Sequence, residues 1–388
     1  MSWPIPDFFV IKKPSEIRYW VWGSVYILLS FLSCFFLWFF LKENADNYII
    51  YISVLVGIAL ALGISLGVRI FIYDNNLMRY TAWEQQRQEA KREWSRWATK
   101  RVAVIASEVI TPKIHLDKIL ASDEKENLFI EEGKALPLLL ISELGLKSRY
   151  EQALEWLLFS LREKLNVAME RNSLDVYFLA EEKHSEPLRH SMVNSWKLTG
   201  LKERYRLHIL TNPISCNDLI DSVLASERNT TPLLVISCQF SLLVTEFISA
   251  IFLCGELCAK DMGIVPIAYV ERPMPTDESN IGTDIGIMKF YGQLSSETPP
   301  LLLFNQVSGD AQAQGISALC RLNNNHEMNS TMIIDSILGK TGNLSEWLCL
   351  GLGTNLVYSL GKPNILITGC CDGSLSVISI IQEEKTES

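Results

Sequence analysis

Two long stretches of uncharged, mostly apolar residues stand near the start of the chain, at Tyr19–Leu41 and Tyr48–Val68. Each is long enough to cross the hydrocarbon core of a bilayer as a helix. The segment between them, Lys42–Asn47, is long enough only for a turn. The pattern therefore predicts a transmembrane hairpin of two helices within residues 1–76.

Basic residues flank this hairpin unevenly. The turn carries one, Lys42, whereas the flanks carry Lys12, Lys13, Arg18, Arg69, Arg79, Arg87, Lys91, Arg92, Arg96, Lys100 and Arg101. Flanking segments rich in lysine and arginine stay in the cytoplasm. We therefore expect a two-pass protein of the bacterial inner membrane, with its N- and C-termini in the cytoplasm.

The segment 77–101 combines tryptophans and basic residues in a helical pattern. A helix of this kind can lie at the lipid headgroups, where aromatic rings and cations are favoured. The candidate membrane anchors are Trp83, Trp94, Trp97, Arg79 and Arg87. The alternative is a solvated helix that continues the second span, and the sequence leaves both open.

From Val102 onward, short β-rich apolar runs alternate with helical patterns. The expected strands are Val102–Ile110, Leu136–Ile141, Asp175–Leu179, Leu207–Leu210, Leu233–Cys238, Val265–Val270, Leu301–Asn305, Met332–Asp335, Asn364–Thr368 and Ser374–Ile380. The expected helices are Arg149–Ala168, His190–Lys202, Asn217–Ser226, Leu242–Met262, Ala311–Arg321 and Leu344–Leu360. This alternation predicts an α/β body with helices on both faces of a sheet.

The range 273–300 interrupts this alternation. It is rich in proline, glycine and acidic residues and has no sustained apolar period. Loops of such length are usually functional or mobile. We interpret it as a linker between a first α/β half, 102–272, and a second half, 301–388.

The charge of the chain indicates which partners fit it, and its cysteines indicate in which compartment the body lies. The formal net charge is −9, and the excess of acidic residues lies after residue 101, so nucleic acid is a poor electrostatic match. The cysteines are nine in number, an odd count, without a CxxC spacing, and most lie in apolar runs. This usage is typical of reduced, buried thiols, which agrees with a cytoplasmic body.

Two motifs that could hold a cofactor or a metal are incomplete. Gly339-Lys340-Thr341 resembles the end of a phosphate-binding loop, but Ile334 stands where its first glycine belongs. Cys254 and Cys258 are one helical turn apart and lack a second pair to complete a metal site. We therefore expect no cofactor and no metal.

Cys238 ends an apolar strand and precedes the helix expected from Leu242, and a thiol at a helix N-terminus has a lowered pKa. Gly342-Asn343 precedes a second long helix. This layout resembles the thiolase-like fold of condensing enzymes. The resemblance implies a Cys–His–Asn set for acyl transfer, with Cys238, His326 and Asn343 as candidates.

This sequence departs from that family around Asn343. His326 lies closer to Asn343 than the family's spacing, and bulky Glu346 and Trp347 stand where small residues usually follow. A thiol without a base and an oxyanion donor performs little acyl chemistry. The departures favour two thiolase-like halves without the activity.

The whole architecture also resembles the bacterial type VI lipase adaptor family. The resemblance rests on two short segments. They are Tyr150–Glu155 on the first long helix expected in the body and Lys340–Ser345 before the last expected helix. The resemblance implies a cytoplasmic protein that binds a phospholipase effector and helps to load it on the secretion spike. It brings no catalytic residues.

These arguments lead to one main expectation and two alternatives. The main one is a non-enzymatic adaptor anchored in the inner membrane, whose partners are a secreted effector, a spike component and the lipid bilayer. The first alternative is a thiolase-like acyltransferase or condensing enzyme that uses Cys238. The second is an immunity protein that holds a toxin.

Overall fold

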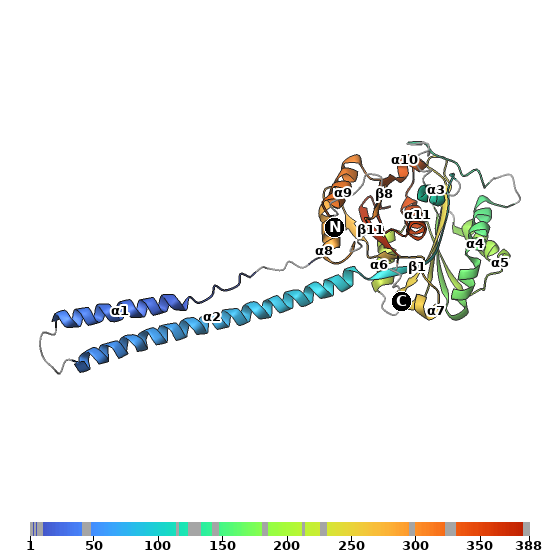
Figure 1. Cartoon of the computed structure of the whole chain (residues 1–388). Helices are drawn as coiled ribbons and strands as arrows, with labels where there is room; N and C mark the ends of the chain where they lie inside the picture. Colours follow the sequence, from blue (N-terminus) through green and yellow to red (C-terminus); the bar gives the residue numbers. More distant parts are fainter. Residues whose placement is uncertain are drawn as a thin grey trace. The chain divides into compact units, whose positions relative to one another are not determined.

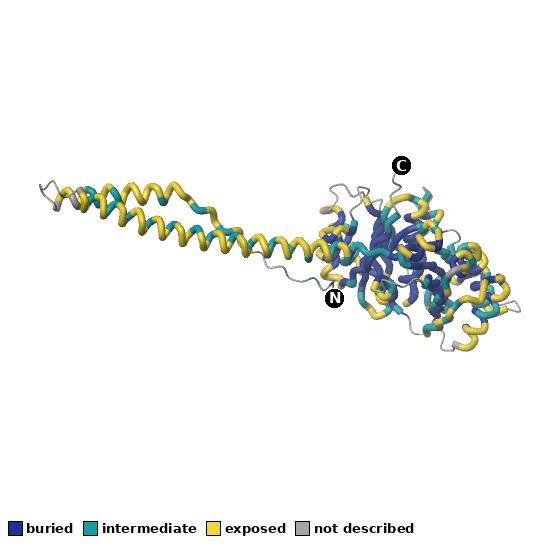
Figure 2. The backbone as a smooth tube through the Cα atoms, turned by 90° about the horizontal axis from the view of Figure 1, so that it is seen from below, coloured by how far each residue is buried: buried dark blue, intermediate teal, exposed yellow. Residues whose placement is uncertain are grey.

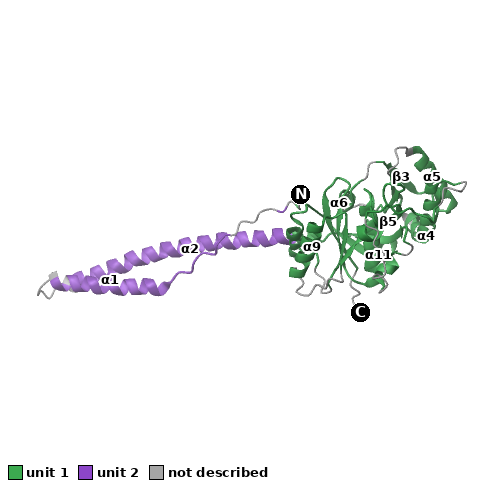
Figure 3. Ribbon diagram, turned by 90° about the horizontal axis from the view of Figure 1, so that it is seen from above, with its two compact units in different colours: residues 1–4, 94–388 green, residues 5–93 purple. Residues whose placement is uncertain are grey.

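The computed structural model describes Trp3, Ile5 and residues 11–40, 48–113, 116–122, 133–141, 147–180, 185–211, 214–225, 231–294, 299–322 and 331–382. The chain forms two compact units, residues 5–93 and residues 1–4 with 94–388 (Figure 3). The first contains the expected hairpin and the second is the α/β body.

The smaller unit consists of helix α1 (Tyr19–Phe40) and most of helix α2 (Tyr48–Ala98). Both contain a stretch long and apolar enough to cross a membrane, and neither stretch is buried inside the protein. Length and composition alone make them candidate spans, so the membrane hairpin stays a prediction. Helix α2 runs without a break to Ala98, as the continuous-helix alternative for residues 77–101 expected.

The tryptophans at the end of α2 pack on the body. Trp94 and Trp97 lie with their ring centroids 4.8 Å apart, and the ring of Trp3 meets that of Trp97 at 5.4 Å. The guanidinium of Arg272 lies 4.0 Å from the Trp97 ring centroid. Trp94 and Trp97 are therefore part of an aromatic cluster of the body, whereas lipid contact of Trp83, Arg79 and Arg87 stays a prediction.

The body contains one mixed sheet with helices around it (Figure 1). Its strands are β1 (Arg101–Ile110), β2 (Leu174–Ala180), β3 (Tyr205–Leu210), β4 (Leu233–Gln239), β5 (Phe247–Gly255), β6 (Ala268–Glu271), β7 (Met274–Thr276), β8 (Leu301–Asn305), β9 (Thr331–Ile333), β10 (Asn364–Gly369) and β11 (Leu375–Ile381). Its helices are α3 (Leu116–Ala121), α4 (Arg149–Arg171), α5 (Ser185–Leu198), α6 (Cys216–Ala225), α7 (Glu256–Met262), α8 (Ile281–Phe290), α9 (Gly309–Leu322), α10 (Ile334–Leu338) and α11 (Ser345–Leu360).

The sheet repeats one topology twice. Its strand order is β3-β2-β4-β5-β1-β6-β11-β10-β8-β9, with β7 paired to β11. In the first half, β5 alone runs antiparallel to its neighbours β4 and β1, and in the second half β11 does the same between β10 and β6. The antiparallel pair β1–β6 joins the halves, for example at Val102 and Val270. The α/β prediction is confirmed, and the second half begins with β6, before residue 273.

Helices α6 and α11 occupy the same place in the two halves, between the third and fourth strands. One hydrophobic core collects residues of both helices and of strands from both halves. The two helices therefore lie between the half-sheets, whereas α4 and α5 cover the outer face of the first half. Figure 2 shows this buried interior. Gly351 permits the close approach of α11, because a Cβ there would lie 2.7 Å from Cγ2 of Val109.

Three expectations about secondary structure are wrong. Leu136–Ile141, expected as a strand, contains no strand residue. The range Leu242–Met262, expected as one helix, contains strand β5 and the short helix α7. β5 pairs with β4 on one side and β1 on the other and is buried on both faces, so its continuous apolar run has no strand-like alternation. The range 273–300, expected as a loop, contains β7 and α8.

Candidate active site at the start of helix α6

The residues that the sequence singled out do not form a site. Cys238 is fully buried on β4, in the core on the α4 side of the sheet, and burial strongly raises the pKa of its thiol. No helix begins after it, so the expected thiolate at a helix N-terminus is absent there. Asn343 is exposed in the turn before α11, and His326 lies outside the described residues.

A different cysteine lies at the start of a helix. Cys216 is the first residue of α6 and is fully buried. Ser215 ends the preceding loop and acts as the cap, because its Oγ accepts the N–H of Asn217 at 3.2 Å and its carbonyl accepts that of Leu219. The thiol of Cys216 is thereby held in the first turn of the helix, inside the body.

Glu346 brings a carboxylate to this thiol from the other half of the body. It lies in the first turn of α11 and is 1% exposed. Neither carboxylate oxygen has a hydrogen-bond partner of regular geometry among the described residues. Burial raises the pKa of Glu346 to about 7, and the backbone N–H of Cys216 with the thiols of Cys370 and Cys216 offsets part of that rise.

The environment keeps Cys216 protonated at rest. Burial, and next the nearby charge of Glu346, raise the pKa of the Cys216 thiol well above its ordinary value. These effects outweigh the helix N-terminus, which alone would favour the thiolate. The site thus pairs a neutral thiol with a carboxyl that titrates near neutrality, an arrangement in which one proton can pass between them.

Three segments are tied together around this pair. Cys370 follows β10, and the side-chain amide of Asn217 donates to its sulfur at 3.6 Å. Ser376 on β11 donates to Oδ1 of Asn217 at 2.6 Å. The indole N–H of Trp347 donates to the carbonyl of Ile214 at 3.1 Å. This hydrogen bond holds the loop that leads into α6 against α11.

A second polar cluster supports the start of α11. The amide of Asn305, at the end of β8, donates to Oγ of Ser345 at 3.0 Å and to Oγ1 of Thr368 at 2.9 Å. Thr341 donates to Asp335 at 2.7 Å. Gln306 has a left-handed φ of 53° and donates its backbone N–H to Asp335. This cluster fixes Ser345, the residue before Glu346, and is satisfied by its own members.

Sequence reasoning missed Cys216, Glu346 and Cys370 as one group. They come from segments far apart in the chain, and only the repeated topology brings them together. One signal is present in the sequence. Glu346 stands at a position where the thiolase-like family usually has a small residue after the Gly-Asn pair. The sequence alone makes this residue evidence against activity, whereas the structure places its carboxylate beside the thiol of Cys216.

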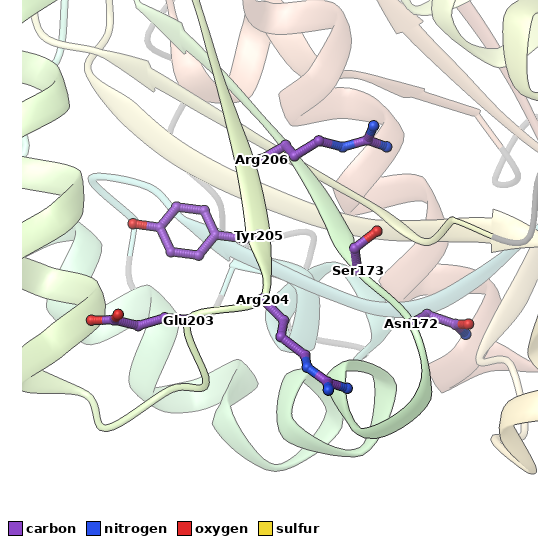
Figure 4. Close-up of a pocket in the computed structure, with 6 residues that line it drawn as sticks. All are labelled: Asn172, Ser173, Glu203, Arg204, Tyr205 and Arg206. Carbon is purple, nitrogen blue, oxygen red and sulfur yellow. The ribbon is translucent and has the colours of Figure 1, made fainter.

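A shallow surface pocket of about 410 Å³ lies at the beginning of β2 and β3, lined by Asn172, Ser173, Glu203, Arg204, Tyr205 and Arg206 (Figure 4). Its cations are already engaged. Arg206 forms two hydrogen bonds with Asp175, at 2.6 and 2.8 Å, and Arg204 donates to the carbonyl of Glu170. Neither Cys216 nor Glu346 lines it. Among the described residues, no group of three or more His, Cys, Asp or Glu is placed to hold a metal ion.

Comparisons with known proteins identify the fold. The sequence matches no protein-family model and no curated protein. A chain of a type II polyketide ketosynthase, solved with its acyl-carrier protein, has a TM-score of 0.51 at 10% identity and covers 73% of this chain and 99% of its own. 3-Oxoacyl-(acyl carrier protein) synthase III of Xanthomonas oryzae has 0.46 at 11%, covering 73% and 99%. Human mitochondrial 3-ketoacyl-CoA thiolase has 0.44 at 9%, covering 74% and 100%. The first of these likenesses shows that the body has the fold of a ketosynthase, which is the thiolase-like fold of condensing enzymes.

These comparisons correct the main functional expectation. The body shares its fold with a ketosynthase, and nothing in the comparisons supports a type VI lipase adaptor or a role in effector loading. The non-enzymatic adaptor is therefore wrong as the main interpretation. The thiolase-like alternative is the better supported one, although its nucleophile cannot be Cys238 in this geometry.

Proposed function

We propose that this protein is an acyl-transfer enzyme of the thiolase-like fold, with Cys216 as the nucleophile and Glu346 as the general base. One observation carries the proposal: a buried carboxyl without a regular hydrogen-bond partner faces a thiol at the first residue of a helix. A buried carboxylate without hydrogen-bond partners destabilises the folded protein. Groups of this kind are found mostly at functional sites.

The reaction follows from this pair. Ionised Glu346 accepts the proton of the Cys216 thiol, and the sulfur attacks the carbonyl carbon of an acyl thioester. The tetrahedral oxyanion forms beside the positive end of α6, which stabilises negative charge. When it collapses, the leaving thiol takes the proton from Glu346 and the acyl group remains on Cys216. A second acceptor then removes the acyl group by the same steps in reverse.

The surroundings of Cys216 favour an aliphatic acyl group. Leu219, Ile220, Leu344 and Trp347 belong to the same buried core as Cys216. An apolar lining binds hydrocarbon and rejects charged acyl groups, because an unpaired charge in it would be costly. Cys371, beside Cys370, is partly exposed, and we propose that the acyl group enters at the turn after β10.

We further propose that α1 and the first part of α2 anchor the enzyme in a membrane, with both flanks on one side. Trp3 precedes the first span, yet it is 5% exposed and packs on the body. Its indole N–H donates to the carbonyl of Pro273 at 2.8 Å. The contact between Trp3, which lies before α1 in the chain, and the body supports a location of both on the same side of the membrane. The basic flanks favour the cytoplasm.

Thiol release tests the proposed activity. The full chain in detergent is mixed with a long-chain acyl-CoA, and the free CoA released in the first turnover is measured. Wild type and Cys238→Ala should release one equivalent of CoA per chain, whereas Cys216→Ala should release none. Cys238 and Cys216 are both fully buried cysteines, so Cys238→Ala controls for the loss of a buried thiol. Equal release by Cys216→Ala and wild type would overturn the proposal.

A further inference from the structure

Arg272, which directly follows strand β6, connects the end of helix α2 with helix α6. Its side chain is only 7% exposed. Nε donates to the carbonyl of Trp97 at 3.2 Å, and the guanidinium lies 4.0 Å from the centroid of the same indole ring. Nη1 donates to Oδ1 of Asp221 on α6 at 2.6 Å. A buried charge destabilises the folded protein unless it is paired and hydrogen-bonded, so the positions of both partners matter.

The segment around Arg272 also fixes the last turn of α2. The final carbonyls of a helix have no partner within the helix itself. The side-chain amide of Gln293, which is fully buried, donates to the carbonyl of Ala98 at 2.6 Å and to that of Arg272 at 3.1 Å. The backbone N–H of Arg272 donates to the carbonyl of Lys100 at 3.2 Å. The end of α2 therefore has a defined position in the body, from which Arg272 extends to α6.

Asp221 lies in the middle of α6, five residues after Cys216. This is about 7.5 Å along the axis of an α-helix. Its neighbours Leu219 and Ile220 belong to the buried core. Apolar contacts of this kind have no preferred direction, whereas a hydrogen-bonded ion pair has one. The bond from Arg272 to Asp221 therefore fixes the rotation of α6 about its axis.

The rotation of α6 decides how Cys216 meets Glu346. Burial raises the pKa of Glu346 to about 7, and the backbone N–H of Cys216 with the thiols of Cys370 and Cys216 lowers it again. The nearby charge of Asp372 raises it further. A rotation that moves Cys216 away would remove two of the lowering effects, so the pKa of Glu346 would rise. It would also lengthen the path of the proton from sulfur to carboxylate.

We infer that Arg272 is a positioning residue for acyl transfer, which fixes α6 through Asp221 and thereby holds the Cys216 thiol at Glu346. The inference rests on the proposed roles of Cys216 and Glu346. A guanidinium suits this task because its planar fork donates in two directions at once, whereas an ammonium is a point charge on a flexible stem. A displacement of about 1 Å in a reacting group can slow a reaction about a hundredfold.

The pH profile of CoA release in the first turnover tests this inference, with the full chain in detergent. Asp221→Asn keeps the shape of a half-exposed side chain and removes its charge. It should slow the release roughly tenfold or more. It should also move the acidic limb of the profile to higher pH, because Glu346 then keeps its proton to a higher pH. Arg272→Lys should have the same two effects, since lysine cannot replace both arms of the guanidinium.

Glu256→Gln is the matched control. Glu256 pairs with Arg101 at 3.2 Å, also at the end of the body where α2 continues into β1, but it lies on α7 instead of α6. This variant should keep the rate and the acidic limb of wild type. A loss of folded protein lowers the rate of a variant without moving the limb, so the position of the limb separates a positioning role from a structural one.

Each result has one meaning. A wild-type limb in folded Asp221→Asn or in folded Arg272→Lys would overturn the inference, whether or not the rate falls. An equal shift in Glu256→Gln would overturn it as well, because the shift would then not depend on α6. Absence of CoA release by wild type at every pH would instead overturn the proposed function, and Arg272 would have no reaction to serve.

Discussion

The carboxylate of Glu346 faces the thiol of Cys216, although 130 positions separate them and each belongs to a different half of the body. Cys216 is the first residue of α6 and Glu346 is the second residue of α11, and these helices occupy equivalent places in the repeated topology. The duplication therefore brings two helix N-termini together between the half-sheets. A site made in this way receives its nucleophile from one half and its base from the other.

Stability should depend on pH through Glu346. Its pKa is raised to about 7 in the folded body from about 4.5 in the unfolded chain, so the folded state binds the proton more tightly. The resulting stabilisation is complete below about pH 4.5 and is lost as the pH rises through 7. Glu346→Gln should unfold like wild type near pH 5 and be more stable at pH 8, by up to about 3 kcal/mol. Urea unfolding of both proteins at the two pH values measures this.

Glu271 provides a check on that result. It is 5% exposed on β6, and burial raises its pKa to about 7 as well. Glu271→Gln should change stability in the same direction and leave acyl transfer unchanged, whereas Glu346→Gln should slow acyl transfer. Equal unfolding curves for Glu346→Gln and wild type at pH 8 would contradict the raised pKa of Glu346.

Gly351 should not tolerate a methyl group. A Cβ at this position would lie 2.7 Å from Cγ2 of Val109 and 3.1 Å from Oγ of Ser107. Gly351→Ala should therefore push α11 off the sheet and destabilise the body by about 1–3 kcal/mol. Gly286→Ala on α8 is the matched control, because no atom lies within 4 Å of its Cβ and alanine favours helices. Thermal unfolding that ranks Gly286→Ala below Gly351→Ala would refute this packing.

Replacing Asn305 with alanine should lower the stability and the rate of CoA release more than replacing Asn343 does. Asn305 is fully buried and bonds to Ser345 and Thr368, so Asn305→Ala should cost about 1–3 kcal/mol and loosen the start of α11. Asn343 is exposed. Asn343→Ala should change neither urea unfolding nor the rate of CoA release, although the family resemblance makes it a candidate. A larger loss of rate in Asn343→Ala than in Asn305→Ala would show that the turn before α11 has another conformation in the active protein.

The topology of the hairpin can be tested with reporters. A phosphatase that is active only outside the cytoplasm should be active when inserted at Asn44 and silent when fused after Ser388. The reason is the excess of basic residues on both flanks of the hairpin. Trp3 gives the same expectation independently, because it packs on the body. An active fusion at Ser388 would refute both arguments.

The α/β class and several strands could be predicted because their physical signal is local. Strand β1 stands at Arg101–Ile110, close to the expected Val102–Ile110, because a β-branched run there is bounded by polar residues. The stretch that forms β5 could not be distinguished from a helix, since both of its faces are buried. The pairing of Cys216 with Glu346 depends on strand order, which no local pattern contains. Cys238 was singled out only because a helix was expected after it.

Peptide mass spectrometry after incubation with acyl-CoA tests the central claim most directly, because it shows which sulfur carries the acyl group. The full chain is quenched in acid and digested, and the acyl mass is located among the peptides that contain Cys216, Cys238, Cys370 and Cys371. The account predicts the acyl mass on Cys216 in wild type, with slower labelling in Glu346→Gln. An acyl group on Cys238, or on no cysteine at all, would contradict it.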